Sequence, residues 1–290
     1  MQNEIHKLTD GESPPLLREI PDAPETLYVR GNTDLLSNPI TKFLTVVGSR
    51  KYSGYGRQAV EYFVGGLRGY DIAIISGLAL GIDALAHKAA LDAGLPTIAV
   101  PGSGLDEQVL YPRSNTMLAR QIVEAGGLLL SEFEPTERAA RWTFPQRNRI
   151  MVGLAHAVLV IEAEERSGTL ITARLTSEYN RELLVVPGSI FSESSKGAHQ
   201  FLKLGATPVT TPQDILTALH IEARADSDGA LSDATLSEEE EKVVELLREP
   251  LARDELLERM NMNVTNANIL LSKMELDGLI TEKMGMVRRV

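Results

Sequence analysis

Short apolar runs recur along the middle of the chain, and their residues are apolar in succession rather than in alternation. Seven runs follow one another: FLTVVGS (43–49), DIAIISG (71–77), PTIAVPG (96–102), GLLLSE (127–132), AVLVIEA (157–163), ELLVVPG (182–188) and TPVT (207–210). Such runs predict strands that are buried on both faces, as in a parallel sheet. The intervals carry helical patterns, for example DALAHKAALDAG (83–94), which closes on a glycine. Residues 41–220 are therefore predicted to form a doubly wound, mostly parallel α/β domain.

The pattern changes on both sides of this domain. Five prolines stand among residues 1–40, which we expect to form an irregular N-terminal arm apart from a short strand in TLYVRG (26–31). Residues 221–236 are polar and acidic, which predicts a linker. In residues 237–290 a capping box at Ser237 and Glu240 opens three predicted helices, and a hairpin with a turn near Gly285 follows. This order predicts a small winged-helix-like domain.

Composition narrows the classes of function. The net charge of −11 disfavours a general nucleic-acid coat, although a local basic groove on an acidic body stays open. The chain has no cysteine, which excludes disulfides, a thiolate nucleophile and cysteine-bound zinc, and its five histidines show no metal-binding spacing. The first residues lack the apolar core of a signal peptide and no run approaches a membrane span, so we expect a cytoplasmic protein without membrane contact.

The predicted strands end in small residues that suit anion binding. Gly48 and Ser49 end the first strand, and Ser76 and Gly77 end the second. Backbone N–H groups at such strand ends lie close to helix N-termini, where they bind phosphate. Gly81 begins the helix after the second strand. At Gly168–Thr169, which starts another predicted helix, an anion cradle and simple capping are equally open.

Other sites on such a sheet are disfavoured. GYGRQA (54–59) matches G-x-G-x-x-A but begins several residues after its strand, and no acidic residue ends the second strand to hold a ribose. No P-loop motif occurs, which excludes a P-loop ATPase. Glu162, Glu164 and Glu165 follow a strand end, where a solvated charged edge is favoured over acid–base chemistry. We predict no catalytic residue, no metal and no cofactor.

Two basic features point to nucleic acid instead. The segment RAARWTFPQRNRI (138–150) contains four arginines, no acidic residue, and two interleaved aromatic residues, Trp142 and Phe144. Basic groups for the backbone and aromatic faces for bases are typical of single-strand binding. An aromatic anchor with solvated arginines is the alternative, and the composition does not decide between them. Arg50 directly follows the first strand, where it would project over the phosphate site unless it forms a surface salt bridge.

Taken together, these stretches resemble the DprA/Smf family of bacterial DNA-processing proteins. The matching segments occur in the family's order: VVGSR (46–50), SGLALGIDALAH (76–87), VPGSGLDEQVLYPRSN (100–115), LLSEFEP (129–135), FPQRNRI (144–150), SGTLITA (167–173) and VVPGS (185–189). The C-terminal residues resemble, more loosely, the winged-helix-like domain that many members carry. In one departure, His199 stands where the family usually has asparagine.

The resemblance implies a Rossmann-like domain that binds single-stranded DNA without catalysis. It implies protection of incoming DNA in natural transformation, help in loading RecA recombinase, and a homodimer that pairs through the Rossmann-like domain. In the implied cradle Arg50 and Arg141 bind phosphates and Phe144 stacks on a base. The full expected set is Gly48, Ser49, Arg50, Ser76, Gly77, Gly81, Arg141, Phe144, Arg147, Arg149, Gly168, Thr169 and Lys196.

Two alternatives and the role of the tail stay open. One alternative is a nucleotide-binding enzyme of the LOG phosphoribohydrolase type, although its glycine-rich and paired arginine–glutamate motifs are not found as such. The other is an NAD(P)-binding regulator. In the tail, the predicted recognition segment VTNANILLSKMELDGL (264–279) has Lys273 as its only basic residue. A major-groove reader would be more basic, which favours a protein-contact or modest DNA role.

Overall fold

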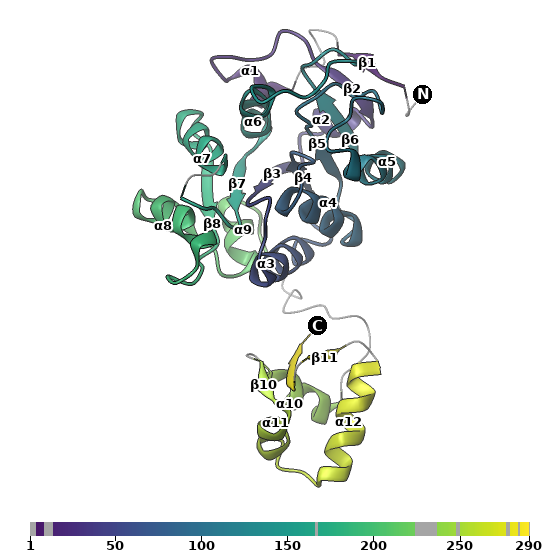
Figure 1. The fold of residues 1–290 in the computed structure, drawn as a ribbon, viewed down its shortest axis with the longest axis vertical. Helices are drawn as coiled ribbons and strands as arrows, with labels where there is room; N and C mark the ends of the chain where they lie inside the picture. Colours follow the sequence, from purple (N-terminus) through teal and green to yellow (C-terminus); the bar gives the residue numbers. More distant parts are fainter. Residues whose placement is uncertain are drawn as a thin grey trace. The chain divides into compact units, whose positions relative to one another are not determined.

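The computed structural model describes residues 4–8, 14–165, 168–223, 237–247, 250–276, 279–283 and 285–289. The chain divides into two compact units, Met1–Asp226 and Ser227–Val290, which Figure 1 colours along the sequence. Most of the predicted linker, residues 224–236, lies outside the described residues, as does Gly278 at the predicted end of the last helix. Within the described part of the chain, no helix is long and apolar enough to span a membrane.

The large unit is built on one nine-stranded sheet in the order β1-β2-β6-β5-β4-β3-β7-β8-β9. Strands β3 to β9 all run parallel to one another, while β2 is antiparallel to β6 and β1 is antiparallel to β2. The predicted mostly parallel sheet is confirmed, with one strand for each of the seven apolar runs. The strands are β1 (His6–Lys7), β2 (Tyr28–Gly31), β3 (Lys42–Val47), β4 (Ile72–Ser76), β5 (Thr97–Ala99), β6 (Leu128–Ser131), β7 (Ala157–Val160), β8 (Glu182–Val185) and β9 (Thr207–Pro208).

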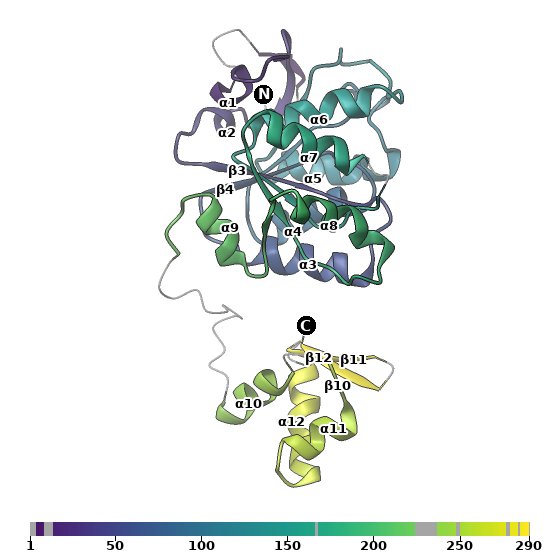
Figure 2. The same ribbon diagram turned by 90° about the vertical axis from the view of Figure 1, so that its left-hand side faces the viewer.

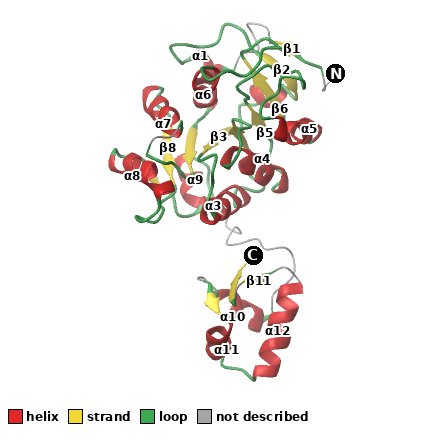
Figure 3. Cartoon of the chain, viewed as in Figure 1, coloured by secondary structure: helices red, strands yellow, loops and turns green. Residues whose placement is uncertain are grey.

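Helices cover both faces of this sheet, which explains the continuous apolar runs. On β3, Phe43 and Val47 belong to one buried cluster, and Leu44 and Val46 belong to the cluster on the opposite face. Successive side chains of a strand point to opposite faces, so both faces need apolar residues. The views in Figures 2 and 3 show helices on either side of the strands. The helices are α3 (Gly54–Gly65), α4 (Ile82–Asp92), α5 (Thr116–Glu124), α6 (Thr143–Leu154), α7 (Thr169–Glu178), α8 (Lys196–Lys203) and α9 (Pro212–Ala218), with 3₁₀ turns at Arg113–Asn115 and Glu193–Ser195.

The N-terminal segment differs from the irregular arm that we expected. It forms β1, the short helices α1 (Pro15–Arg18) and α2 (Asp34–Ser37), and β2, which extends the sheet beside β6. The strand predicted within residues 26–31 is confirmed by β2. Leu17 on α1 is fully buried in the sheet's core. The prolines are compatible with this order because Pro15 occupies the first turn of α1, where no intrahelical N–H bond is lost. The segment is thus part of the large unit.

The small unit has the predicted order of elements with one additional strand. Its elements are α10 (Glu238–Leu246), β10 (Leu251–Ala252), α11 (Arg253–Arg259), α12 (Val264–Leu276), β11 (Ile280–Lys283) and β12 (Met286–Arg289). The capping box is confirmed: the N–H of Ser237 donates to Glu240 Oε2 over 2.8 Å, and the N–H of Glu240 donates to Ser237 Oγ over 3.3 Å. Gly285 has a φ of 74° in the hairpin turn, and β10 pairs with β12. Three helices against a small antiparallel sheet give a winged-helix-like domain.

A buried histidine makes the stability of the large unit depend on pH. His87 on α4 is fully buried, and its Nδ1 lies 2.7 Å from Thr97 Oγ1. The Thr97 hydroxyl donates to the Ile74 carbonyl, so Nδ1 is the donor in the first bond. Burial lowers the pKa of His87 from 6.5 to about 3. Between these values the unfolded chain binds the proton and the folded protein does not.

We therefore expect His87 to destabilise the fold as pH falls below its unfolded pKa, by up to about 1.4 kcal/mol per pH unit. The variant His87→Gln removes this titration and should show a flatter loss of unfolding free energy between pH 7 and 5 than the wild type. Urea titrations followed by the fluorescence of Trp142, the single tryptophan, measure this in the large unit. Parallel curves for the two proteins would contradict the assignment, whatever their offset.

Candidate nucleic-acid interface

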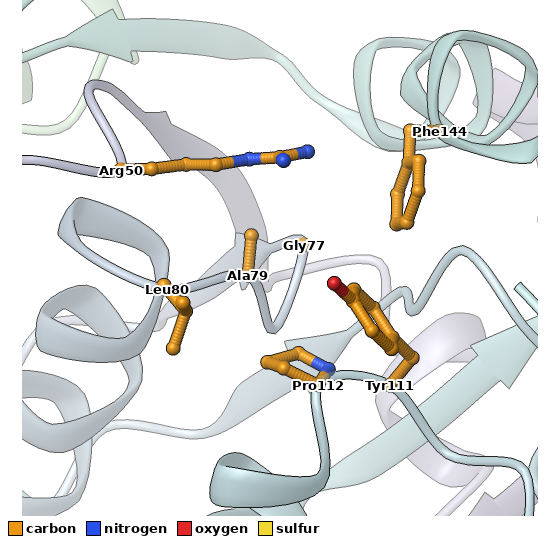
Figure 4. A pocket seen from close by; sticks show the side chains of 7 residues that line it. All are labelled: Arg50, Gly77, Ala79, Leu80, Tyr111, Pro112 and Phe144. Atoms are coloured by element: carbon orange, nitrogen blue, oxygen red, sulfur yellow. The ribbon is translucent and has the colours of Figure 1, made fainter. Parts of the chain in front are cut away.

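A small hollow lies beyond the carboxyl ends of β3, β4 and β5, where ligands bind in open α/β sheets. Its cavity volume is about 30 Å³. Figure 4 shows the side chains of Arg50 and Tyr111, which come from loops, and of Phe144, which comes from helix α6, converging on this space. We call it the Arg50–Phe144 hollow, and its lining residues are Arg50, Gly77, Ala79, Leu80, Tyr111, Pro112 and Phe144.

Arg50 and Phe144 are far apart in sequence and contact each other across the hollow. The Arg50 Cζ lies 5.2 Å from the centroid of the Phe144 ring, which is within the range of a cation–π interaction. Arg50 is exposed, and its guanidinium has no hydrogen bond or ion pair within the described part of the chain. The alternative of a surface salt bridge is therefore not observed. A cation and a half-buried aromatic face are both presented to a ligand here.

Two of the predicted glycines let the backbones that form the hollow approach each other. Gly81 has a φ of 85°, and a Cβ built there would lie 2.6 Å from the Cα of Arg50. A Cβ on Gly48 would lie 2.7 Å from the side chain of Ile82. The Ile82 N–H donates to the Ser49 carbonyl over 3.1 Å, which joins the start of α4 to the end of β3. These residues position Arg50.

Tyr111 is a member of the site that the sequence reasoning missed. Its ring is tilted by 55° against Phe144 at a centroid distance of 5.6 Å. Tyr111 is 48% exposed, so part of its ring face is open to a ligand. The neighbouring side chain of Leu80 is 50% exposed. The available signal was the place of Tyr111 in the loop after the third apolar run, since the loops after parallel strands gather at one edge of the sheet.

The start of α6 is held by a buried hydroxyl group, whereas the two residues before the helix are exposed. The Thr143 hydroxyl donates to the Gly102 carbonyl over 2.6 Å and is fully buried. A Cβ on Gly102 would lie 2.7 Å from Phe144 Cδ1, so the ring packs directly on this glycine. Trp142 is 57% exposed and meets Phe133 edge-on. Arg141 is exposed and has no ion pair among the described residues.

The structure corrects the expectation for two further arginines of this segment, Arg147 and Arg149. Arg147 is 4% exposed, and its Nη1 donates to the carbonyls of Gly77 and Val100. Burial lowers its pKa to about 10. The missed signal is helical spacing: on a helix that begins at Thr143, position 147 shares a face with the buried Ile150 and Leu154.

Arg149 is likewise held by the protein rather than presented to a ligand. Its guanidinium forms ion pairs with Glu132 and with Asp22, the second at 3.6 Å. It also donates to the carbonyl of Asp22 in the N-terminal segment. Neither arginine is therefore available to bind phosphate.

The remaining predicted residues do not line the hollow, apart from Gly77. The Ser76 hydroxyl is fully buried and donates to the Val46 carbonyl over 2.7 Å. The Lys196 ammonium lies 2.6 Å from Glu193 Oε1. Gly168 and Thr169 stand at the start of α7, next to residues outside the described ranges, and no side-chain cap is formed there. Their role in anion binding stays a prediction.

Glu162 is buried, although we expected the glutamates at this strand end to form a solvated charged edge. Its position also argues against dinucleotide binding. Glu162 is 2% exposed and accepts bonds from the Ser53 N–H over 3.0 Å, the Ser53 hydroxyl over 2.5 Å and the Ser194 hydroxyl over 3.0 Å. Ser53 caps α3, and a Cβ on Gly56 would lie 2.6 Å from Glu162 Cδ. The protein's own carboxylate thus occupies the helix N-terminus where a dinucleotide fold binds pyrophosphate.

Asp83 is a buried carboxyl group at the start of α4. It is 7% exposed, and burial raises its pKa although Arg147 and Arg50 act in the opposite direction. Its Oδ2 accepts from the N–H of Ala79 over 3.4 Å. Within the described ranges, no cluster of three or more metal-binding side chains is present.

Both units of the chain are similar to known proteins of one family. Residues 4–220 match the family model described as DNA recombination-mediator protein A, and residues 228–286 match the DprA winged helix domain. The DNA processing protein DprA of Streptococcus pneumoniae is 46% identical over 200 residues, which are 69% of this chain and 68% of that protein. Protein Smf of Escherichia coli is 41% identical over 222 residues, which are 76% of this chain but only 58% of that protein.

Two solved structures are similar to the large unit. The X-ray structure of DNA processing protein A from Streptococcus pneumoniae has a TM-score of 0.68 at 41% identity and covers 77% of this chain and 76% of its own. DNA processing protein A from Helicobacter pylori has a TM-score of 0.67 at 29% identity, over 75% of this chain and 96% of its own. The Helicobacter structure is described as giving insight into that protein's single-stranded DNA binding mode.

Proposed function

The chain belongs to the DprA/Smf family of DNA-processing proteins, and from that premise we propose that it binds single-stranded DNA in the Arg50–Phe144 hollow. Its role is DNA processing in natural transformation, and it acts by binding rather than by catalysis. The observation that carries the proposal is the Arg50–Phe144 contact of 5.2 Å, because it joins a free cation to an accessible aromatic face. These are the two groups that a single strand needs.

Each part of a nucleotide has a partner at this site. Arg50 and Arg141 pair with phosphates, and Phe144 stacks on one base. A base that takes the ring face displaces the guanidinium of Arg50, which then pairs with the adjacent phosphate. Neither contact reads the hydrogen-bonding edge of a base, so little sequence preference follows.

The assembly and the cellular role extend the proposal. The family resemblance supports a cytoplasmic homodimer that pairs through the Rossmann-like domain and helps to load RecA recombinase. Two copies of a short site would engage one strand together or bridge two strands, and avidity would then supply affinity that a single hollow lacks.

The surface of α12 in the small unit is better suited to contact a protein than to bind DNA. On α12, Val264 is 63% exposed and Ile269 is 64% exposed. Lys273, the only basic residue of this helix, pairs with Glu240 at 2.9 Å. Apolar side chains and a neutralised cation are not the groups that bind a phosphate backbone.

Anisotropy of a labelled oligothymidine, titrated with this protein at several salt concentrations and competed with duplex DNA, tests the proposed function. Binding that weakens with salt and that duplex DNA does not displace is expected. The absence of binding at low salt would overturn the proposal. In that case, release of free base from AMP would be the next measurement, because it detects phosphoribohydrolase activity.

Tyr111 offers a test that separates its ring from its hydroxyl. The variant Tyr111→Ala is expected to weaken oligothymidine binding about fivefold, the lower end of the 1–3 kcal/mol for an aromatic contact with a base. Tyr111→Phe keeps the ring and should bind like the wild type. The same titration compares both. Equal weakening by the two variants would show that the hydroxyl, not the ring face, contacts DNA.

A further inference from the structure

A buried arginine joins three of the segments that form the hollow. Arg147 lies one helical turn after Phe144, so both side chains leave α6 on neighbouring positions of one face. Its guanidinium donates to the carbonyl of Gly77, at the end of β4, and to the carbonyl of Val100, at the end of β5. Burial of a cation is costly unless such bonds compensate it. The arrangement therefore fixes α6 to two strand ends at once.

The loop after β4 is built around this guanidinium. A Cβ on Gly77 would lie 2.5 Å from Arg147 Cζ, so only glycine lets the backbone pack on it. Ala79 and Leu80, which follow, line the hollow opposite Phe144. The buried carboxyl group of Asp83 holds the same loop by accepting a hydrogen bond from the N–H of Ala79. The positions of Leu80 and Phe144 therefore depend on one shared group.

We propose that Arg147 is a positioning residue for the DNA site: it sets the Phe144 ring against the loop of Ala79 and Leu80 without contacting DNA itself. This inference rests on the proposed function. Arginine suits the role because its planar fork can donate to two carbonyls in fixed directions, whereas the lysine ammonium is a compact point charge on a flexible stem. A loosened support misplaces a binding group without removing it.

The variant Arg147→Lys keeps the positive charge but removes the planar guanidinium, so it tests whether the paired hydrogen bonds to Gly77 and Val100 matter. We expect the Kd for labelled oligothymidine to rise about tenfold, as when the residues that support a binding site are loosened, with an unchanged slope of log Kd against log salt. Arg149→Lys is the matched control, because Arg149 lies on the same helix, is largely buried and is ion-paired away from the hollow. It should lower thermal stability and leave the Kd unchanged.

A second variant tests the same inference without changing Arg147 or any charged residue. Gly77→Ala places a Cβ against the guanidinium and should raise the Kd with the salt slope again unchanged, which keeps the test valid if Arg147→Lys does not fold. A salt slope that falls in Arg147→Lys would overturn the inference, because it would show a phosphate contact. So would a Kd that rises equally in Arg149→Lys, or one that stays at the wild-type value in both test variants. Failure of the wild type to bind would instead refute the proposed function.

Discussion

Replacement of Arg50 or Arg141 by alanine is expected to weaken oligothymidine binding and to lower its dependence on salt. Each arginine that pairs with a phosphate of a single strand displaces about 0.7 of a counterion, so each variant should reduce the slope of log K against log salt by about that amount. Both side chains are exposed, and no hydrogen bond or ion pair ties either of them to the described parts of the chain. The fold should therefore remain intact.

The control for this experiment replaces an arginine of the large unit that does not line the Arg50–Phe144 hollow. Arg174 on α7 has a side chain that is 82% exposed and pairs with Glu178 one turn later. Arg174→Ala changes the net charge as the two test variants do, and it should leave the salt slope near the wild-type value. Anisotropy titrations at four salt concentrations provide the slopes. Unchanged slopes in both Arg50→Ala and Arg141→Ala would rule out this phosphate cradle.

Phe144→Ala is expected to show a large loss of affinity with an unchanged salt slope. Stacking of one base on an aromatic ring contributes about 1–3 kcal/mol, which corresponds to a rise in Kd of about 5- to 150-fold. The ring is half-buried against Gly102 and is contacted by Arg50 and Tyr111, so its removal also loosens the other two side chains. The result would separate the stacking contribution from the electrostatic one.

Two variants define how the Phe144 result is interpreted. Phe144→Tyr keeps the ring and should retain most of the affinity. Tyr62→Ala removes an aromatic residue of α3 that is 54% exposed, and it should leave binding unchanged. If Phe144→Ala bound as tightly as Tyr62→Ala in the same titration, the base would have to stack on another residue of the hollow, and Tyr111 would be the first to examine.

The fold was predictable because its signal is local and repeated. Each buried strand of a parallel sheet needs apolar side chains on both faces, and the seven continuous runs meet that need one after another. The capping box at Ser237 and the turn at Gly285 are also local patterns, and both are observed. Apart from the strand within residues 26–31, the N-terminal segment was not predicted, since its short elements depend on the sheet edge at β6 and on the core around Leu17.

Local patterns were enough to predict the doubly wound sheet, the winged-helix-like unit, and the presence of cations and aromatic rings near the strand ends. Which of these side chains face solvent became visible in the folded chain. Arg50 and Arg147 both stand in motifs that suggested phosphate binding, yet one is exposed over Phe144 and the other is enclosed by the carbonyls of Gly77 and Val100. The physical reason is that burial and the choice of hydrogen-bond partner depend on segments far apart in the chain, which no local pattern records.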